Sequence, residues 1–367
     1  MPSGRQGTDG NGSNVTARAS FDRPSLRRRL SRLARTSPSV VARAARRELV
    51  WRRHEAALAR ALRERRRRLL VGPFLGEVGF ELLYWLPVLR RLLAGVEPER
   101  VTVLARGGAG GWYRDVAADA IDVLELVPPE GYVDELVERR RREGNTKQFF
   151  PDRLDRRLTR LALDRVGDAA VVHPLLMYSR MRFVLEGLQP PAAATRIGDY
   201  RPLAVEERAL PPGCPPDYVA VKLYFSDSFP DGEASRELAA TLLAELAGET
   251  DVVVLTSGTQ LDEHREWVPG GAHIHDSSAW VTPHDNLAVQ TALVARARAL
   301  VATYGGFSYL GPMLGVPTLS LYTQEVFQWV HLHVLRAAYP DADYELIGPD
   351  ELAEAARFAG RTAGVRR

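Results

Sequence analysis

The stretch "ARALVATYGGFSYLGPMLGVPTLSLYT", residues Ala297–Thr323, contains the elements from which the fold is predicted. A run of apolar residues ends at Thr303, two glycines follow, and a short helix is expected from about Tyr309. A second apolar run, TLSLY, then begins at Thr318. Strand, glycine turn, helix and strand in this order are typical of a parallel α/β sheet. The glycine turn is therefore expected at the carboxyl end of a strand.

The residues of this turn suit an anionic ligand. Gly305 and Gly306 let the main chain approach a ligand closely, and Ser308 is expected to cap the following helix. Free main-chain N–H groups at the start of a helix bind phosphate well. The alternative is a tight strand-to-helix turn that needs glycine only for steric reasons.

The same alternation of apolar runs and helical segments occurs twice along the chain, separated by a segment rich in proline. It predicts an α/β fold of two Rossmann-like parallel-sheet domains that face a cleft. Ligands of open α/β sheets bind beyond the carboxyl ends of the strands, so the cleft is the expected site. The predicted parts are an Arg-rich disordered and helical arm (1–68), an N-terminal α/β domain (69–188), a Pro-rich linker (189–217) and a C-terminal α/β domain (218–367).

Local patterns give further expectations about secondary structure. Residues 40–68 lack glycine and proline and are expected to be helical, with the ordered fold beginning near Leu69. A short helix is predicted over 112–120 and a strand over 121–126. TLSLY is expected to be the last clear strand.

Composition indicates a soluble protein of a reducing compartment. The chain has 367 residues, of which 45% are hydrophobic, enough for two domains with a sizeable core. Cys214 is the single cysteine, which excludes an internal disulfide framework. No uncharged apolar run approaches the roughly 20 residues that span a bilayer, and the N-terminus lacks the apolar core of a secretory signal. We expect a cytoplasmic protein.

The net charge of +3 is distributed unevenly. The first 70 residues hold 19 arginines and five acidic residues, a balance of +14, which leaves −11 for the remainder. Such an arm could contact nucleic acid or an anionic membrane surface, and the second would place the protein at the inner face of the membrane. The alternative is an exposed arm without a partner in a chain that uses arginine nearly everywhere. Nucleic acid is not an expected partner of the acidic core.

The stretch around the glycine turn resembles the donor-binding segment of GT-B glycosyltransferases, especially the ADP-heptose:lipopolysaccharide heptosyltransferase family. That segment has a strand, a small-residue turn with serine, a short helix, a G-V-P-T bend and another strand. The preceding "HDNLAVQTALVARARALVAT" is similar to its lead-in helix and strand. The resemblance covers about Asp285 to Tyr322 well and the rest by element order. The family often has histidine where this chain has Tyr309.

A second stretch, "VGPFLGEVGFELLYWLP" (71–87), is similar to the first strand, loop and helix of the same family. There a G-D dipeptide, five residues and a proline supply the acid that is the proposed catalytic base. Here Gly76-Glu77 match the dipeptide, whereas Glu81 has the matching distance to Pro87. The resemblance implies that Glu77 or Glu81 is the base, and Glu77 is favoured because a loop can aim it across the cleft. Alternatively, Glu81 stabilises a helix start and Glu77 is solvated.

Further donor contacts are implied at the ends of the strands of the C-terminal domain. Lys222, in "VAVKLYFSD", stands where GT-B enzymes often place a basic residue against the donor diphosphate. The alternative is a strand-end lysine that reaches solvent. The other candidates are polar or small residues after strands, any of which could be an ordinary loop residue: Thr256, Ser257 and Gly258 in the nucleotide pocket, and Glu325 for a ribose hydroxyl.

Several other patterns do not support a site of their own. "RGGAGGWY" (106–113) lacks G-x-G-x-x-G spacing and is expected to shape the acceptor side of the cleft. His331 and His333 would share a face only in a strand, and their surroundings are helical in pattern.

The resemblance thus implies a hexosyl- or heptosyltransferase of polysaccharide biosynthesis, inverting and independent of bound metal or cofactor. Its partners would be a nucleotide-sugar donor and a saccharide or other hydroxyl acceptor. Two alternatives stay open: a sugar-nucleotide epimerase of the same fold, and a non-catalytic interaction protein that acts through its basic arm.

Overall fold

The computed structural model describes residues 38–143, 148–204, 208–225, 229–257, 265–266, 270–322, 329–348, 357–358 and 360–361. The chain divides into two units, Met1–Val41 and Ala42–Arg367, and the sheets lie in the second. Residues 1–37 of the predicted arm lie outside the described residues. Among the residues that are described, none of the helices combines the length and apolar character needed to cross a membrane.

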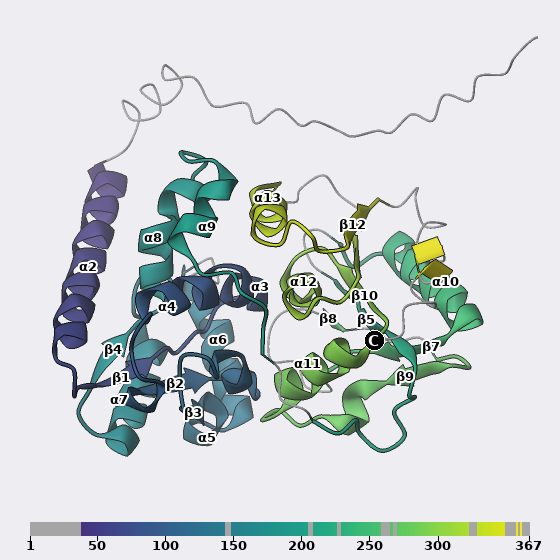
Figure 1. The fold of residues 1–367 in the computed structure, drawn as a ribbon, viewed down its shortest axis with the longest axis horizontal. Helices are drawn as coiled ribbons and strands as arrows, with labels where there is room; N and C mark the ends of the chain where they lie inside the picture. The colour runs from purple at the N-terminus through teal and green to yellow at the C-terminus, as the bar shows by residue number, and fades with distance from the viewer. Residues whose placement is uncertain are drawn as a thin grey trace, which may run out of the picture. The chain divides into compact units, whose positions relative to one another are not determined.

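The first lobe is built on a four-stranded parallel sheet (Figure 1). Its strand order is β3-β2-β1-β4, which is the order of the first four strands of a Rossmann fold. The strands are β1 (Arg68–Val71), β2 (Val101–Ala105), β3 (Asp119–Asp122) and β4 (Ala169–Val172). The helices are α3 (Val78–Phe80), the π-helical turn η1 (Glu81–Trp85), α4 (Leu86–Leu92), η2 (Pro98–Arg100), η3 (Ala109–Tyr113), α5 (Val123–Leu126), α6 (Pro129–Glu143), α7 (Arg153–Val166) and α8 (Leu175–Leu185).

The second lobe has a six-stranded parallel sheet of order β12-β11-β10-β5-β7-β9. Its strands are β5 (Tyr218–Lys222), β7 (Asp251–Val254), β9 (Ile274–Asp276), β10 (Ala299–Thr303), β11 (Thr318–Leu321) and β12 (Tyr344–Ile347). A short antiparallel pair joins β6 (Tyr224–Phe225) to β8 (Arg265–Glu266). The helices are α10 (Glu233–Glu249), η5 (Ser277–Trp280), α11 (Asn286–Arg296), η6 (Gly306–Tyr309), α12 (Leu310–Leu314) and α13 (Trp329–Ala338) (Figure 1).

The strand order of the second lobe identifies its ligand crevice. Numbered by their order within the lobe, the six strands lie 3-2-1-4-5-6, the full Rossmann order. The order reverses between β5 and β10, and ligands bind at such a switch point beyond the carboxyl ends of the strands. Lys222 ends β5 and the glycine turn follows β10. The prediction of two parallel α/β sheets is confirmed, and β12 adds a strand after TLSLY that was not predicted.

The segment between the lobes is hydrogen-bonded to both of them. It contains two helical turns, η4 (Pro191–Ala193) and α9 (Ala194–Ile197). The Asp199 amide donates to the Pro87 carbonyl of the first lobe at 2.8 Å. The Leu203 amide donates to the Met313 carbonyl of the second lobe, also at 2.8 Å. The Pro-rich linker is therefore anchored to both lobes through its middle part.

Helix α2 (Pro38–Arg63) corrects the expectation that the ordered fold begins near Leu69. Trp51, Leu58 and Ala61 of this helix are buried in the main hydrophobic core. The Trp51 indole also donates to the Phe149 carbonyl at 3.3 Å. From residue 42 onward, α2 packs on the first lobe, because three apolar residues at helical spacing stand among its arginines. The helix ends at Arg63 rather than at residue 68, where β1 begins.

Two local predictions near β3 are also wrong. The strand predicted over 121–126 ends at Asp122, because the Asp122 carboxylate accepts the Leu124 amide at 2.9 Å and starts α5. The helix predicted over 112–120 is instead the 3-10 helix η3, which begins earlier, at Ala109, and ends at Tyr113.

Candidate active site

The two lobes meet where Gly79 lies against Gly306. A Cβ atom on Gly79 would stand 2.8 Å from the Gly306 nitrogen and 3.1 Å from Cε2 of Tyr309. No side chain fits between these two segments of main chain. Gly305 and Gly306 have φ values of 104° and 40°, which favour glycine, so the turn needs both. The contact brings the loop that carries Glu77 next to the glycine turn of the second lobe.

Glu77 is exposed and is the N-cap residue of helix α3. Its carbonyl accepts the Phe80 amide at 3.0 Å and the Glu81 amide at 3.1 Å. The preceding Gly76 carbonyl accepts a hydrogen bond of 2.7 Å from the Arg106 guanidinium. Glu77 is therefore an exposed residue at a fixed position of the main chain, directly before the short helix that contains Gly79.

Glu81 lies in a different environment and is only 1% exposed. The Tyr113 hydroxyl donates to its Oε1 at 2.5 Å, and Arg106 lies 3.7 Å from its Oε2. Burial raises the pKa of Glu81, and the Arg106 charge and the Tyr113 hydrogen bond act against that rise. The two predicted glutamates thus differ: one is exposed on a turn, and the other ties together elements inside the first lobe.

Buried side chains far along the chain hold the loop before Glu77. Gln148 accepts the Leu75 amide at 2.7 Å and donates to the Pro73 carbonyl at 3.0 Å. The Arg139 guanidinium donates to the Leu75 carbonyl at 3.3 Å. Gln148 and Arg139 are fully buried or nearly so, and no sequence pattern connected either residue to this loop.

Gln148 and Arg139 are themselves anchored by a buried polar cluster. Gln148 donates to Asp155 at 2.7 Å, and Arg139 pairs with Asp152 at 2.6 Å. His173 lies 3.0 Å from the same Asp155 oxygen. Burial and the neighbouring Asp155 raise the pKa of Asp152 to about 6. Because these contacts leave few alternative geometries, the main chain that leads to Glu77 is fixed.

On the donor side, Lys222 does not reach solvent. It is 8% exposed, and its Nζ donates to the Leu255 carbonyl at 2.9 Å and to Oε1 of Glu266 at 2.5 Å. The other Glu266 oxygen accepts the Ser257 amide at 2.7 Å and the Ser257 hydroxyl at 3.0 Å. Lys222 also lies 5.7 Å from the centre of the Phe307 ring, next to the glycine turn. The structure thus brings Lys222, Ser257 and the turn together around Glu266.

Thr256 and Ser308 are buried, and both are hydrogen-bonded within the second lobe. The Thr256 amide donates to the Ser277 hydroxyl at 2.9 Å, and its hydroxyl donates to Asp276. Ser308 does not occupy the cap position that was predicted for it. Gly305 has that position, and its amide donates back to the Ser308 hydroxyl at 3.3 Å. Through these hydrogen bonds, Thr256 and Ser308 hold the main chain in place where it leaves β7 and β10. Gly258 and Glu325 lie outside the described residues.

Two residues near the turn escaped sequence reasoning. A Cβ atom on Gly306 would lie 2.7 Å from the Tyr224 hydroxyl, so this side chain of β6 lies over the turn. Glu266 comes from the two-residue strand β8, which pairs with β6. The only signal for Tyr224 was its place two residues after Lys222, and no pattern pointed to Glu266.

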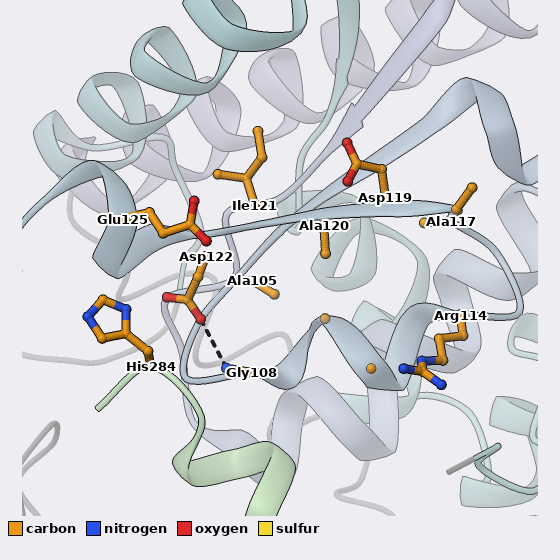
Figure 2. Close-up of a pocket in the computed structure, with 13 residues that line it drawn as sticks. Ala105, Gly108, Arg114, Ala117, Asp119, Ala120, Ile121, Asp122, Glu125 and His284 are labelled. Carbon is orange, nitrogen blue, oxygen red and sulfur yellow. Dashed lines mark hydrogen bonds between the residues drawn. The ribbon is translucent and has the colours of Figure 1, made fainter. Parts of the chain in front are cut away.

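A pocket of about 370 Å³ lies between η3 and β3 (Figure 2). Figure 2 shows Asp122, Glu125 and His284 toward one end, and Arg114 and Asp119 toward the other. Carboxylates accept hydrogen bonds from hydroxyls and a guanidinium donates them, so the lining suits a ligand rich in hydroxyl groups. Its other lining residues are Ala105, Gly108, Gly110, Gly111, Ala117, Ala118, Ala120 and Ile121.

No protein-family model matches the chain, and a search of curated proteins gave no match. Solved structures similar to it include a family 9 glycosyl transferase from Veillonella parvula, with 15% identity, a TM-score of 0.37, and coverage of 82% of this chain and 90% of that one. The E. coli ADP-heptose lipopolysaccharide heptosyltransferase II has 13% identity, a TM-score of 0.41, and coverage of 81% and 100%. The glycosyltransferase SnogD from Streptomyces nogalater has 18% identity, a TM-score of 0.34, and coverage of 81% and 95%. The similar structures thus include the kind of enzyme that the sequence resembles.

Proposed function

We propose that this chain is a glycosyltransferase that moves a sugar from a nucleotide-diphosphate sugar to an acceptor hydroxyl. The observation that carries the proposal is the contact between Gly79 and Gly306. It sets an exposed carboxylate of the first lobe beside the switch point of the second, where phosphate groups bind in Rossmann folds. An acceptor and a donor that occupied the two lobes would meet at this contact.

Glu77 is the proposed base. It would take the proton from the acceptor hydroxyl while the acceptor oxygen forms a bond to the anomeric carbon. The bond from that carbon to the diphosphate oxygen breaks at the same time, so the configuration inverts. The exposure of Glu77 and the fixed main chain around it support this role. The burial of Glu81 and its bond to Tyr113 favour a structural role for that residue.

The leaving diphosphate would be held by donors from the second lobe. The main chain of the glycine turn (Gly305 and Gly306), the Ser257 hydroxyl and the Lys222 ammonium are the proposed contacts. Fixed donors of this kind stabilise the charge that develops on a leaving group, and we propose that no metal ion is required. We assign the acceptor to the pocket of Figure 2. The turn that lines this pocket is joined to the loop of Glu77, because the Arg106 guanidinium donates to the Gly76 carbonyl.

The test has two steps. The full chain is first screened by thermal shift against nucleoside diphosphates and their sugars, with EDTA present. Ligands that carry one particular nucleobase should raise the melting temperature. Release of that nucleoside diphosphate is then measured with a panel of saccharide acceptors. Release that requires an acceptor supports a transferase. Conversion of the donor sugar without any acceptor would support the epimerase instead, and no stabilisation by any nucleotide would contradict both.

A further inference from the structure

The carboxylate of Glu266 is held by a set of donors that would suit a phosphate group. Lys222 Nζ lies 2.5 Å from one of its oxygens, and the Ser257 amide and hydroxyl lie 2.7 and 3.0 Å from the other. An ammonium, a main-chain N–H and a hydroxyl that converge on one anion form strong, charge-assisted hydrogen bonds. The Lys222 side chain is only 10% exposed, so this charge pair is largely shielded from water.

Lys222 Nζ and the amide and hydroxyl of Ser257 form a cradle of donors, and this cradle lies where the fold is expected to bind a ligand. Lys222 ends β5, and Ser257 follows β7, its neighbour in the sheet. Both residues thus stand at the carboxyl edge of the sheet, and Lys222 lies beside the switch point, where Rossmann folds bind phosphate. Glu266 belongs to neither strand. It lies on β8, which pairs with the two residues of β6 and takes no part in the six-stranded sheet.

The Glu266 carboxylate and a diphosphate cannot occupy the cradle at the same time, because both are negatively charged. With Glu266 in place the Lys222 charge is already neutralised, and a diphosphate at the same donors would be repelled by the carboxylate. Because β8 lies outside the main sheet, its carboxylate can leave the cradle without breaking a ladder of that sheet.

We propose that Glu266 is an internal competitor, which occupies the phosphate site of the second lobe until the diphosphate of the donor displaces it. This inference rests on the proposed function, since it concerns the donor site of the transferase. The apparent affinity for a diphosphate is then lowered by the fraction of molecules in which the carboxylate fills the cradle. Regulation or specificity at this site would act through the release of Glu266.

The experiment measures binding of inorganic pyrophosphate and of ADP, UDP and GDP by calorimetry. The wild-type chain is compared with Glu266→Gln, which keeps the shape and removes the charge, and with Glu266→Ala, which empties the cradle. We expect both variants to bind pyrophosphate and the preferred nucleotide tenfold or more tightly than the wild type. Glu245→Gln is the matched control, because it removes one charge from an exposed position of α10 in the same lobe and should leave affinity unchanged. Melting temperatures verify that each variant is folded.

The outcomes separate this inference from the proposed function. If a nucleotide binds the wild type and Lys222→Ala weakens it, but neither Glu266 variant tightens it, the inference is overturned and the transferase proposal stands. Weaker binding in the Glu266 variants would also overturn it, since Glu266 would then position Lys222 for the ligand. If pyrophosphate binds Glu266→Gln more tightly but no nucleotide binds any chain, the competitor role stands and the proposed function fails.

Discussion

Gly79 and Gly306 approach so closely that a methyl group on Gly79 would lie 2.8 Å from the Gly306 nitrogen. Gly79 lies in α3 of the first lobe and Gly306 in η6 of the second, far apart in the sequence. Their contact requires glycine on both sides, since Gly306 also has a φ of 40° and lies under the Tyr224 hydroxyl. The position of the Glu77 loop relative to the glycine turn depends on this pair.

Gly79→Ala should therefore disturb the site directly. The added carbon meets main-chain atoms that cannot rotate away, and overpacking of this kind costs about 1–3 kcal/mol of stability. A shift of about 1 Å between reacting groups can lower turnover about 100-fold. Turnover and chemical denaturation are measured together. Gly248→Ala is the control, because a Cβ at this position of α10 meets nothing within 4 Å and should stabilise the helix by about 0.5–1 kcal/mol. Equal behaviour of the two variants would contradict the close contact.

The second prediction separates the two glutamates. Glu77→Gln removes the proposed base without changing its size, so turnover should fall about 10²–10⁴-fold while donor affinity is retained. Glu81→Gln still offers an oxygen to the Tyr113 hydroxyl and should affect stability more than turnover. Steady-state release of nucleoside diphosphate, with donor affinity measured separately, distinguishes these effects. Near-normal turnover in Glu77→Gln would remove it as the base.

The third prediction concerns the proposed acceptor pocket. Asp119→Asn keeps the size of a pocket-lining side chain but removes its charge, and it should raise KM for the acceptor several-fold with kcat nearly unchanged. Donor affinity should stay as in the wild type, because the pocket lies in the first lobe apart from His284. An unchanged KM for every acceptor would place the acceptor elsewhere.

Sequence patterns predicted the parts of the fold that depend on local order. Apolar runs gave β1, β5 and β10, of which β1 and β10 are followed by glycine, and they placed Lys222 and Gly305 near strand ends, where the structure has them. These signals are strong because a buried parallel strand needs a continuous apolar run and its carboxyl-end turn often needs glycine.

What the sequence could not show depends on contacts between distant residues. Glu266 belongs to a strand of two residues, too short for any periodic signal, yet it binds Lys222 at 2.5 Å. Gln148 supports Leu75 across 73 positions of the chain. The burial of Trp51 was hidden because arginines dominate the composition of its helix. Pattern and composition report neither long-range pairing nor the packing of one isolated aromatic residue.

The packing of α2 leads to a fourth prediction. Trp51 is 2% exposed and lies in the main core, so Trp51→Ala should lower the free energy of unfolding by about 3–5 kcal/mol. Arg52→Ala, at the next position, changes a side chain that is 77% exposed and should cost less than about 0.5 kcal/mol. Urea denaturation of both variants provides the comparison. Similar stability of the two variants would mean that α2 is part of an arm that does not pack on the first lobe.

The last prediction concerns pH, through His54 on the same helix. Burial, together with the nearby His173, whose ring centre is 5.6 Å away, lowers the pKa of His54 to about 4. In the unfolded chain a histidine titrates near pH 6.5. Between about pH 6.5 and 4 the unfolded chain therefore binds more protons, so this residue makes stability fall as the pH falls.

His54→Gln cannot be protonated and should flatten that dependence. Its melting temperature should decline less than that of the wild type between pH 7 and 4.5. The number of protons taken up on unfolding should differ between the two proteins by less than one per molecule. His284→Gln, at an exposed histidine, should follow the wild-type curve. The contribution of Asp152, whose raised pKa has the opposite effect on stability, is common to all three proteins and cancels in the comparison. Parallel curves for His54→Gln and the wild type would mean that His54 is protonated as readily in the folded chain as in the unfolded one.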